Sequence, residues 1–265
     1  MEPLVSIATP VWNTARFLPA ALDSLLAQDH PHWECLLWDD GSTDGSAEIA
    51  AEYSRRDPRF RLLGNGRNNG VGIALSSALD AARGDYVGVL DGDDLLEPDA
   101  LSSMLAFMQA RPQLGMAYSQ YVEIDEDGGE LGLGGRFRTP YSPQRLLLEF
   151  MTYHFRLARS DAYRAVGGFD PSMDVSADYD FCLRMSERHP VEHLPKDGLR
   201  VIQPPAHVDV LGATAGKYEG DQGPPAGRRA AGRRVVDERR HDRPLLARAH
   251  HHVLARRHHQ QRQRE

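Results

Sequence analysis

The sequence has few cysteines and no long apolar run. Its only two cysteines, Cys35 and Cys182, lie far apart among 265 residues. They suggest neither a disulfide framework nor a zinc site, so we expect a reducing, cytoplasmic compartment. No stretch approaches the roughly 20 apolar residues that a membrane-spanning helix needs, and the first residues lack the features of a signal peptide. We therefore expect no transmembrane segment, while peripheral contact with a membrane stays open.

The sequence also lacks a basic excess. Its net charge is −7, and residues 1–211 are more acidic than that figure suggests because residues 212–265 carry an excess of arginine. Nucleic-acid binding needs a basic surface, so we expect no nucleic-acid partner. Residues 212–265 show no sustained helical or strand period, which predicts a disordered or irregular basic tail rich in His and Arg. Either a diverged extension or a stretch read out of frame explains this composition.

Three common nucleotide and hydrolase motifs are missing. There is no Gly-x-x-x-x-Gly-Lys-Ser/Thr loop, and no Gly-x-Gly-x-x-Gly follows the first predicted strand. Nor is there a Gly-x-Ser-x-Gly elbow. The sequence is therefore not that of a P-loop kinase, a dinucleotide-binding dehydrogenase or a hydrolase with a serine elbow.

What the sequence does contain is a regular alternation of strand-like and helical patterns. Strands are predicted at 4–9, where Pro10 ends the run, and at 33–38, 60–63 and 86–90, with helices between them and at 98–110. This order predicts an α/β fold with a mostly parallel sheet and helices on both faces. Further along we expect strands at 115–124, 151–158 and 191–194, a hairpin turn at 125–129, a flexible stretch at 132–135, and helices at 143–150, 160–166 and 177–187.

An acidic cluster follows the predicted strand 86–90. Asp91 and Asp93 are separated by one residue at the strand end, before a predicted helix with Pro98 at its first position. Paired carboxylates at this edge of an α/β sheet suit Mg²⁺ or Mn²⁺ together with a phosphate ligand. The alternative is a simple turn at Asp91 and Gly92. We favour the cation site, because a helix rather than a returning strand follows.

Other polar residues end neighbouring strands. Asp39 and Asp40 follow the predicted strand 33–38, and Thr9, Pro10 and Asn13 follow the first strand. Parallel strands end at one edge, so these residues are expected near Asp91, where a carboxylate can accept a hydrogen bond from a base or a ribose. An Asx turn before the next helix is the structural alternative.

Asp178 is a candidate general base at the start of a predicted helix. An N-cap explains it about equally well. Asp180 has Arg184 four residues later, so a solvated ion pair accounts for it. His154 is predicted to be a surface residue of a strand near an acceptor-binding region.

Taken together, these motifs resemble those of the inverting family 2 nucleotide-sugar glycosyltransferases. The resemblance covers about residues 3–195, and no single motif is specific by itself, whereas the order and spacing of the set are. It rests on the stretches Pro3–Pro10 with Trp12-Asn13, Asp39–Asp44, Asn69-Gly70, Gly84–Tyr86 with Leu90–Asp94, Gly167–Asp170 and Asp178–Arg184.

The resemblance implies a GT-A (Rossmann-like) fold with a nucleotide-sugar-binding half at 1–110 and an acceptor-binding half at 111–211. It implies a metal-dependent transfer of sugar from a UDP- or dTDP-linked donor to a hydroxyl of a saccharide or another acceptor. Its site residues carry over as follows: Thr9, Pro10, Asn13, Asp40, Asn69 and Asp91 contact the nucleotide sugar, Asp91 and Asp93 bind Mg²⁺ or Mn²⁺, and Asp178 is the general base.

Some positions depart from the family pattern. Ala177 stands where the family often has Glu, Ser76 where it often has Asn, and the segment after about residue 196 lacks an Arg-x-His pattern, for which His207 is a poor substitute. An inactive nucleotide-sugar-binding protein is therefore the alternative to an enzyme. A nucleotidyltransferase is a third reading, although the first strand is not followed by the Gly-rich basic loop that it needs.

Overall fold

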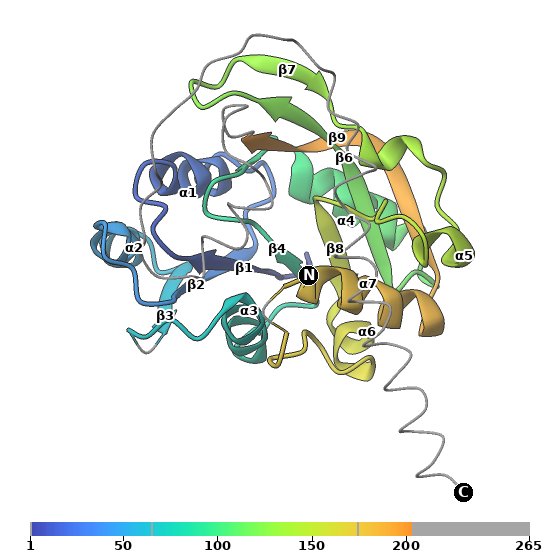
Figure 1. The fold of residues 1–265 in the computed structure, drawn as a ribbon, viewed down its shortest axis with the longest axis horizontal. Coiled ribbons are helices and arrows are strands. Elements are labelled where there is room, and N and C mark those ends of the chain that lie inside the picture. The colour runs from blue at the N-terminus through green and yellow to red at the C-terminus, as the bar shows by residue number, and fades with distance from the viewer. Residues whose placement is uncertain (1, 65, 174, 203–265) are drawn as a thin grey trace, which may run out of the picture. The chain divides into compact units, whose positions relative to one another are not determined.

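The computed structural model describes residues 2–64, 66–173 and 175–202. The basic tail predicted at 212–265 and His207 both lie outside the described residues. Figure 1 shows a curved sheet with helices packed around it. The predicted α/β fold class is confirmed.

The first half of the chain forms a parallel sheet in the order β3-β2-β1-β4. Crossovers between parallel strands are right-handed. Helices in crossovers that move toward opposite edges of the sheet therefore cover its opposite faces. Accordingly α1 and α2 pack together on one face, and α3 covers the other (Figure 1). The strands are β1 (Val5–Val11), β2 (Trp33–Asp39), β3 (Phe60–Gly64) and β4 (Tyr86–Val89), and the helices are α1 (Leu18–Leu26), α2 (Ser46–Arg56) and α3 (Val71–Asp80).

The second half extends the same sheet beyond β4. β8 pairs antiparallel with β4 and β6, and β9 runs parallel to β6. β5 pairs with β9, and β7 pairs with β6. The elements are β5 (Leu95–Leu96), α4 (Ala100–Gln109), β6 (Met116–Ile124), β7 (Glu130–Leu133), the 3₁₀ turn η1 (Arg136–Arg138), α5 (Pro143–Leu146), β8 (Arg156–Arg159), α6 (Ser160–Ala165), α7 (Ala177–Arg188) and β9 (Val191–Ile202).

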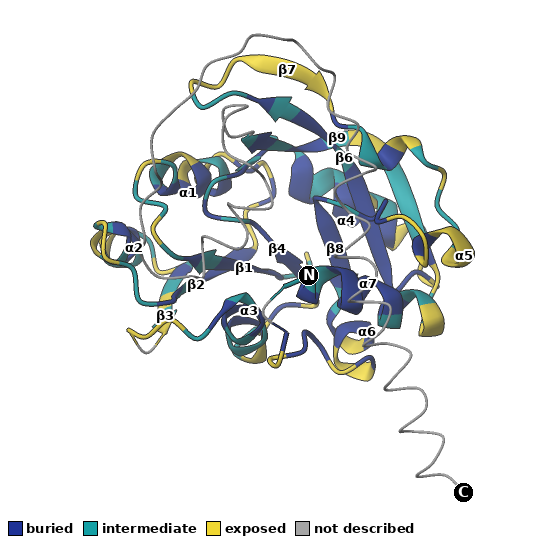
Figure 2. Cartoon of the chain, in the orientation of Figure 1, coloured by how far each residue is buried: buried dark blue, intermediate teal, exposed yellow. Residues whose placement is uncertain are grey.

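β1, β2, β4 and β6 form the buried centre of the sheet, whereas β7 and the outer faces of the helices are exposed (Figure 2). In the helix predicted at 98–110, the helical spacing of Leu101, Met104, Leu105 and Met108 predicts a buried apolar face, and all four side chains are buried in α4. Tyr179, Cys182 and Leu183 of α7 are buried as well. Helical periodicity thus identified the faces that hold α4 and α7 against the sheet.

Several predicted boundaries were wrong. Pro10 does not end β1, which continues to Val11, because β1 pairs with β4 only as far as Ala8 and a proline is tolerated where one side is unpaired. The helix predicted at 98–110 begins at Ala100 as α4, and Leu95 and Leu96 just before it form the short strand β5.

Three predictions in the second half also differ from the structure. The stretch predicted to be flexible at 132–135 overlaps β7, the strand predicted at 151–158 is confined to β8, and the strand predicted at 191–194 continues to Ile202. Long-range pairing decides these cases. β9 reaches Ile202 because it lies beside almost the whole of β6, a partner that its own sequence does not reveal.

The strand order reverses between β1 and β4, because the chain leaves β1 toward β2 and returns to its other side at β4. Open α/β sheets form their ligand crevice at such a point, beyond the carboxyl ends of the strands. Here the loops after β1 and β4 are in close contact: a Cβ built on Gly92 would lie 3.0 Å from Thr14 Oγ1 and 3.4 Å from the Pro10 carbonyl oxygen. The topology therefore places the functional edge at these two loops.

Candidate functional site

The loops that follow β1 and β2 are joined by side chains. Asn13, whose φ is 52°, accepts a hydrogen bond at Oδ1 from the Thr43 N–H at 2.8 Å, and its own N–H donates to Ser42 Oγ at 3.2 Å. Asp39 Oδ1 accepts from the Ser42 N–H, three residues further on, at 3.2 Å. The Asx turn predicted through Asp40, Gly41 and Ser42 is therefore wrong, because the Asp40 carboxylate accepts hydrogen bonds from a different loop. Asn13 therefore fixes the spacing of two loops at the crevice.

Asp40 joins the third loop to the same edge. It is 3 % exposed, and its two carboxylate oxygens accept the backbone N–H groups of Asn69 and Gly70 at 2.8 and 3.0 Å. Burial raises the pKa of Asp40, although these hydrogen bonds oppose the shift. The observed contacts hold the loop between β3 and α3 against the end of β2.

The two remaining residues predicted at the end of β1 differ in exposure. Thr9 is fully buried, and its hydroxyl lies 3.5 Å from Cys35 Sγ in the sheet interior. A ligand at this edge would reach the backbone of Thr9, not its side chain. Pro10 is half-buried and faces Trp38 in the register of β1 and β2.

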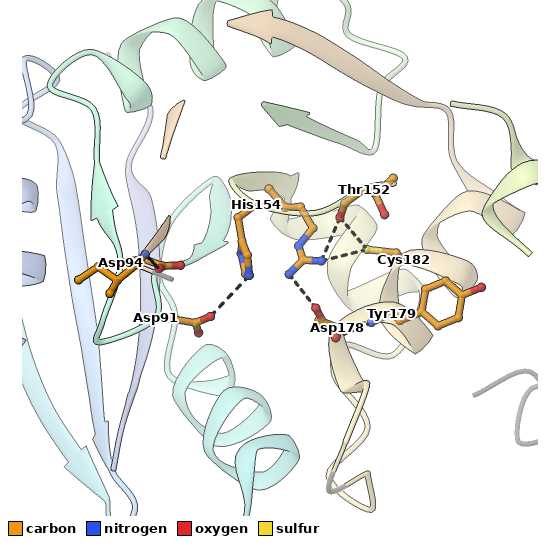
Figure 3. Close-up of polar contacts among 9 residues, drawn as sticks. Asp91, Asp94, Thr152, His154, Asp178, Tyr179 and Cys182 are labelled. Carbon is orange, nitrogen blue, oxygen red and sulfur yellow. Dashed lines mark hydrogen bonds and ion pairs between the residues drawn. The ribbon is translucent and has the colours of Figure 1, made fainter. Parts of the chain in front are cut away.

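Asp91, Asp94 and His154 form a cluster at the end of β4 (Figure 3). One ligand atom of each residue lies within 4.8 Å of the others, and His154 Nε2 is 3.5 Å from Asp91 Oδ2. Asp94 is 4 % exposed and His154 is 6 % exposed, whereas the Asp91 side chain is 38 % exposed. Asp94 Oδ1 also accepts the Ile202 N–H at 3.3 Å. The cluster is thus open to solvent on the Asp91 side.

These three side chains suit a divalent cation. Two carboxylates this close repel each other, and a cation between them removes that repulsion. Burial, with the nearby charge of Arg156, lowers the pKa of His154 to about 3, which leaves a neutral imidazole with a lone pair at neutral pH. Two carboxylate oxygens and one neutral imidazole nitrogen are a donor set that can hold a divalent cation such as Mn²⁺ or Mg²⁺.

The composition of this cluster differs from the sequence-based interpretation. Asp93, predicted as a metal ligand together with Asp91, is half-buried and is not one of the three grouped residues. His154 was predicted to lie on the surface of a strand, which is wrong, because it is buried and points toward Asp91. Asp94 and His154 are therefore candidate cation ligands that sequence reasoning missed.

Asp178 lies in the first turn of α7, on the other side of the segment that carries His154 (Figure 3). Ser176, not Asp178, occupies the N-cap position, so the capping alternative is not what the structure shows. Asp178 Oδ1 accepts the Tyr179 N–H at 2.8 Å, and Asp178 Oδ2 accepts from Arg156 Nη2 at 3.2 Å. Its side chain is 29 % exposed, which leaves the carboxylate accessible.

The neighbouring acid on α7 has a different environment. Asp180 pairs with Arg184 at 2.7 Å as predicted, but its side chain is only 2 % exposed. The prediction of a solvated pair was wrong, because Asp180 faces the core and Arg184 reaches over it to donate to the Val166 carbonyl oxygen at 2.6 Å.

The fold and the acidic cluster at the sheet edge define the class of the protein as an α/β transferase with a GT-A fold. A family model described as Glycosyl transferase family 2 matches residues 6–167. The chain belongs to glycosyl transferase family 2, which confirms the resemblance drawn from its motifs.

Named relatives agree with this assignment. The chain is 34 % identical over 194 residues to the chondroitin synthase of Escherichia coli, a match that covers 73 % of this chain and 28 % of that protein. It is 32 % identical over 194 residues to the hyaluronan synthase of Pasteurella multocida, covering 73 % of this chain and 20 % of that one. The chain thus spans less than a third of the length of these two relatives.

Solved structures share the fold at low identity. S. aureus TarS 1-349 in complex with UDP-GlcNAc has a TM-score of 0.65 at 18 % identity, covering 81 % of this chain and 66 % of that one. The mannosyltransferase PcManGT of Pyrobaculum calidifontis, in complex with GDP-Man and Mn2+, has a TM-score of 0.63 at 18 % identity, covering 81 % and 61 %. Within the described ranges, no helix combines the length and the hydropathy that a membrane span requires.

Proposed function

We propose that this chain is a metal-dependent, inverting glycosyltransferase that moves a sugar from a nucleoside-diphosphate sugar to an acceptor hydroxyl. The observation that carries the proposal is the cluster of Asp91, Asp94 and His154 at the crevice between β1 and β4. Family membership supports it, and so do two structural neighbours, one bound to UDP-GlcNAc and one to GDP-Man with Mn2+. A UDP- or dTDP-linked donor is the first to test.

In this proposal the loops after β1, β2 and β3 hold the nucleotide. Asp40 and Asn69 would contact the base side of the crevice, with Asn13, Pro10 and the backbone of Thr9 along its wall. Asp91 would hold the cation, together with Asp94 and His154 or with Asp93. A bound Mn²⁺ or Mg²⁺ would neutralise charge on the leaving diphosphate. The division into a donor half at 1–110 and an acceptor half at 111–211 belongs to the same proposal.

Asp178 acts as the general base. Its partly exposed carboxylate takes the proton of the acceptor hydroxyl while that oxygen attacks the anomeric carbon, and the nucleoside diphosphate departs from the opposite face. The configuration at the anomeric carbon is therefore inverted. A positioned base of this kind contributes a rate factor of about 10²–10⁴. The saccharide or other acceptor binds on the side of α7.

The test is turnover by the complete chain. The protein is incubated with UDP-, dTDP- and GDP-sugars and a panel of saccharide acceptors, with Mn²⁺, with Mg²⁺ and with EDTA, and release of nucleoside diphosphate is measured. We expect metal-dependent release that falls about 10²–10⁴-fold in Asp178→Asn while nucleotide binding persists. Nucleotide binding without turnover in the wild type would instead indicate an inactive nucleotide-sugar-binding protein.

A further inference from the structure

A single segment that leads into β8 and includes its first residue contacts both parts of the proposed site. Thr152–Arg156 supplies His154 to the acidic cluster and Arg156 to Asp178. Figure 3 shows Asp91 and Asp178 on opposite sides of this segment, with His154 directed toward Asp91. The spacing between the cation cluster and the carboxylate of α7 is therefore fixed by a few consecutive residues.

Arg156 is held rigidly in the interior. It is 6 % exposed, and Nη1 donates to the Thr152 carbonyl oxygen at 3.0 Å and lies 3.7 Å from Cys182 Sγ. The Phe150 ring centroid is 5.5 Å from the guanidinium carbon. Because Nη1 is occupied by fixed groups, Nη2 has a defined direction, and it donates to Asp178 Oδ2 at 3.2 Å.

A second ion pair on the same helix has the opposite arrangement. In the Asp180–Arg184 pair the carboxylate is buried, with 2 % of its side chain exposed, and the arginine is 19 % exposed. In the Asp178–Arg156 pair the arginine is buried, with 6 % exposed, and the carboxylate is 29 % exposed. In the first pair Arg184 covers the buried Asp180, whereas in the second pair the buried Arg156 holds the partly exposed Asp178.

We propose that Arg156 is the positioning residue of the general base, holding the Asp178 carboxylate at a fixed distance from the cluster of Asp91, Asp94 and His154. Arg156 itself contacts no substrate in this proposal. The planar guanidinium is required because it must bond Thr152 and Asp178 at the same time, which a lysine ammonium cannot do in the same geometry. The inference rests on the proposed function, since it assigns a role within that reaction.

The decisive variant is Arg156→Lys, which keeps the positive charge and removes the planar guanidinium with its two Nη donors. We expect kcat to fall about 10- to 100-fold, because a small displacement of a reacting group costs rates of this order. The KM for the donor sugar should stay within about twofold, since Arg156 does not touch the nucleotide crevice. In an Asp178→Asn background, Arg156→Lys should lower kcat little further, because the general base that Arg156 positions has already been removed.

Arg184→Lys is the matched control. It changes the other ion pair of α7 in the same chemical way, and we expect a lower melting temperature with kcat within about twofold of the wild type. A purely structural role for Arg156 predicts a different pattern. The two lysine variants would then lose kcat equally, and the fold-losses in kcat of Arg156→Lys and Asp178→Asn would multiply in the double variant. Melting curves identify any variant that does not fold, and Arg156→Gln then replaces Arg156→Lys in the series.

The outcomes separate the two proposals. If the wild type transfers sugar and Arg156→Lys keeps its kcat, the positioning role is wrong and the proposed function stands. A rise in the donor KM with unchanged kcat would likewise overturn it. If the wild type binds nucleotide sugar but never releases nucleoside diphosphate with any acceptor, the proposed function fails, and the positioning role fails with it.

Discussion

His154 Nε2 lies 3.5 Å from Asp91 Oδ2, although one residue follows β4 and the other precedes β8. The two segments run in opposite directions in adjacent strands, since β4 and β8 are antiparallel. A residue just after β4 and a residue just before β8 therefore meet at the same edge of the sheet. This pairing, rather than the Asp-x-Asp spacing, forms the candidate cation cluster with Asp94.

The cluster predicts which residues govern cation affinity. We expect His154→Gln and Asp94→Asn each to weaken Mn²⁺ binding in the presence of UDP by at least about tenfold, because the first removes the imidazole nitrogen and the second removes a negative charge from the cluster. Asp93→Asn should have a smaller effect. Isothermal titration with Mn²⁺ measures all three. A larger loss in Asp93→Asn than in the other two would favour the Asp91 and Asp93 ligand pair that the sequence suggests.

Much of the fold was predictable from local patterns. The β-α alternation gave the parallel half of the sheet, and the apolar spacing of α4 and α7 gave their buried faces, because both are local periodicities. The strand ends also brought Asp40 and Asp91 to one edge, as expected for parallel strands. What local pattern did not give is the antiparallel placement of β8 between β4 and β6.

The missed site residues follow from that same placement. His154 belongs to a segment with no motif of its own, and only its neighbour β4 determines that it is buried beside Asp91. Asp94 was visible as part of an acidic run, but its burial depends on β9 ending beside it, where the Ile202 N–H donates to Asp94. Both facts depend on long-range pairing that a single sequence does not encode locally.

Asp40 is predicted to be a structural determinant of the nucleotide crevice. In Asp40→Asn only one side-chain oxygen remains to accept the two N–H groups of Asn69 and Gly70, so one buried donor loses its partner. We expect the free energy of unfolding to fall by about 1–3 kcal/mol and affinity for UDP to fall with it. Urea denaturation and titration with UDP measure the two effects. Unchanged stability would mean that this loop is held by other contacts.

Gly72→Ala is predicted to destabilise the protein, although glycine to alanine usually stabilises a helix. Replacing glycine by alanine within a helix ordinarily raises the free energy of unfolding by up to about 1 kcal/mol. Here a Cβ would lie 2.4 Å from the Met173 carbonyl oxygen and 2.7 Å from the Asp170 carbonyl oxygen, so the turn before α7 would have to move. We expect Gly72→Ala to destabilise the protein by about 1–3 kcal/mol.

Ser77→Ala in the same helix is the comparison for Gly72→Ala. It adds no bulk, so its effect on the free energy of unfolding should stay within about 0.5 kcal/mol. Because α3 contacts the turn that leads to Asp178, Gly72→Ala should also lower turnover. Equal thermal stability of the two alanine variants would show that the turn accommodates the extra methyl group.

Glu34 is predicted to make stability depend on acidity. Burial by itself would raise the pKa of Glu34, but hydrogen bonds from Ser6 Oγ at 2.7 Å, the Arg83 N–H at 2.8 Å and Arg61 at 2.7 Å lower it below its usual 4.5. The unfolded chain therefore binds a proton at Glu34 at a higher pH than the folded chain does. The resulting stabilisation is complete above pH 4.5 and disappears as the pH falls through the lower folded-state value.

Glu34→Gln isolates this contribution. At pH 7 we expect the free energy of unfolding to be lower than that of the wild type by about 1–3 kcal/mol, and the difference should shrink as the pH falls below 4.5, because the wild-type carboxylate is then protonated as well. Urea denaturation at intervals from pH 7 to pH 3.5 measures it. Glu52→Gln is the control, since Glu52 is 58 % exposed and pairs only loosely with Arg56 at 3.8 Å, so its effect should be small at every pH. A difference between wild type and Glu34→Gln that stays constant across this range would show that Glu34 contributes through shape and packing instead of charge.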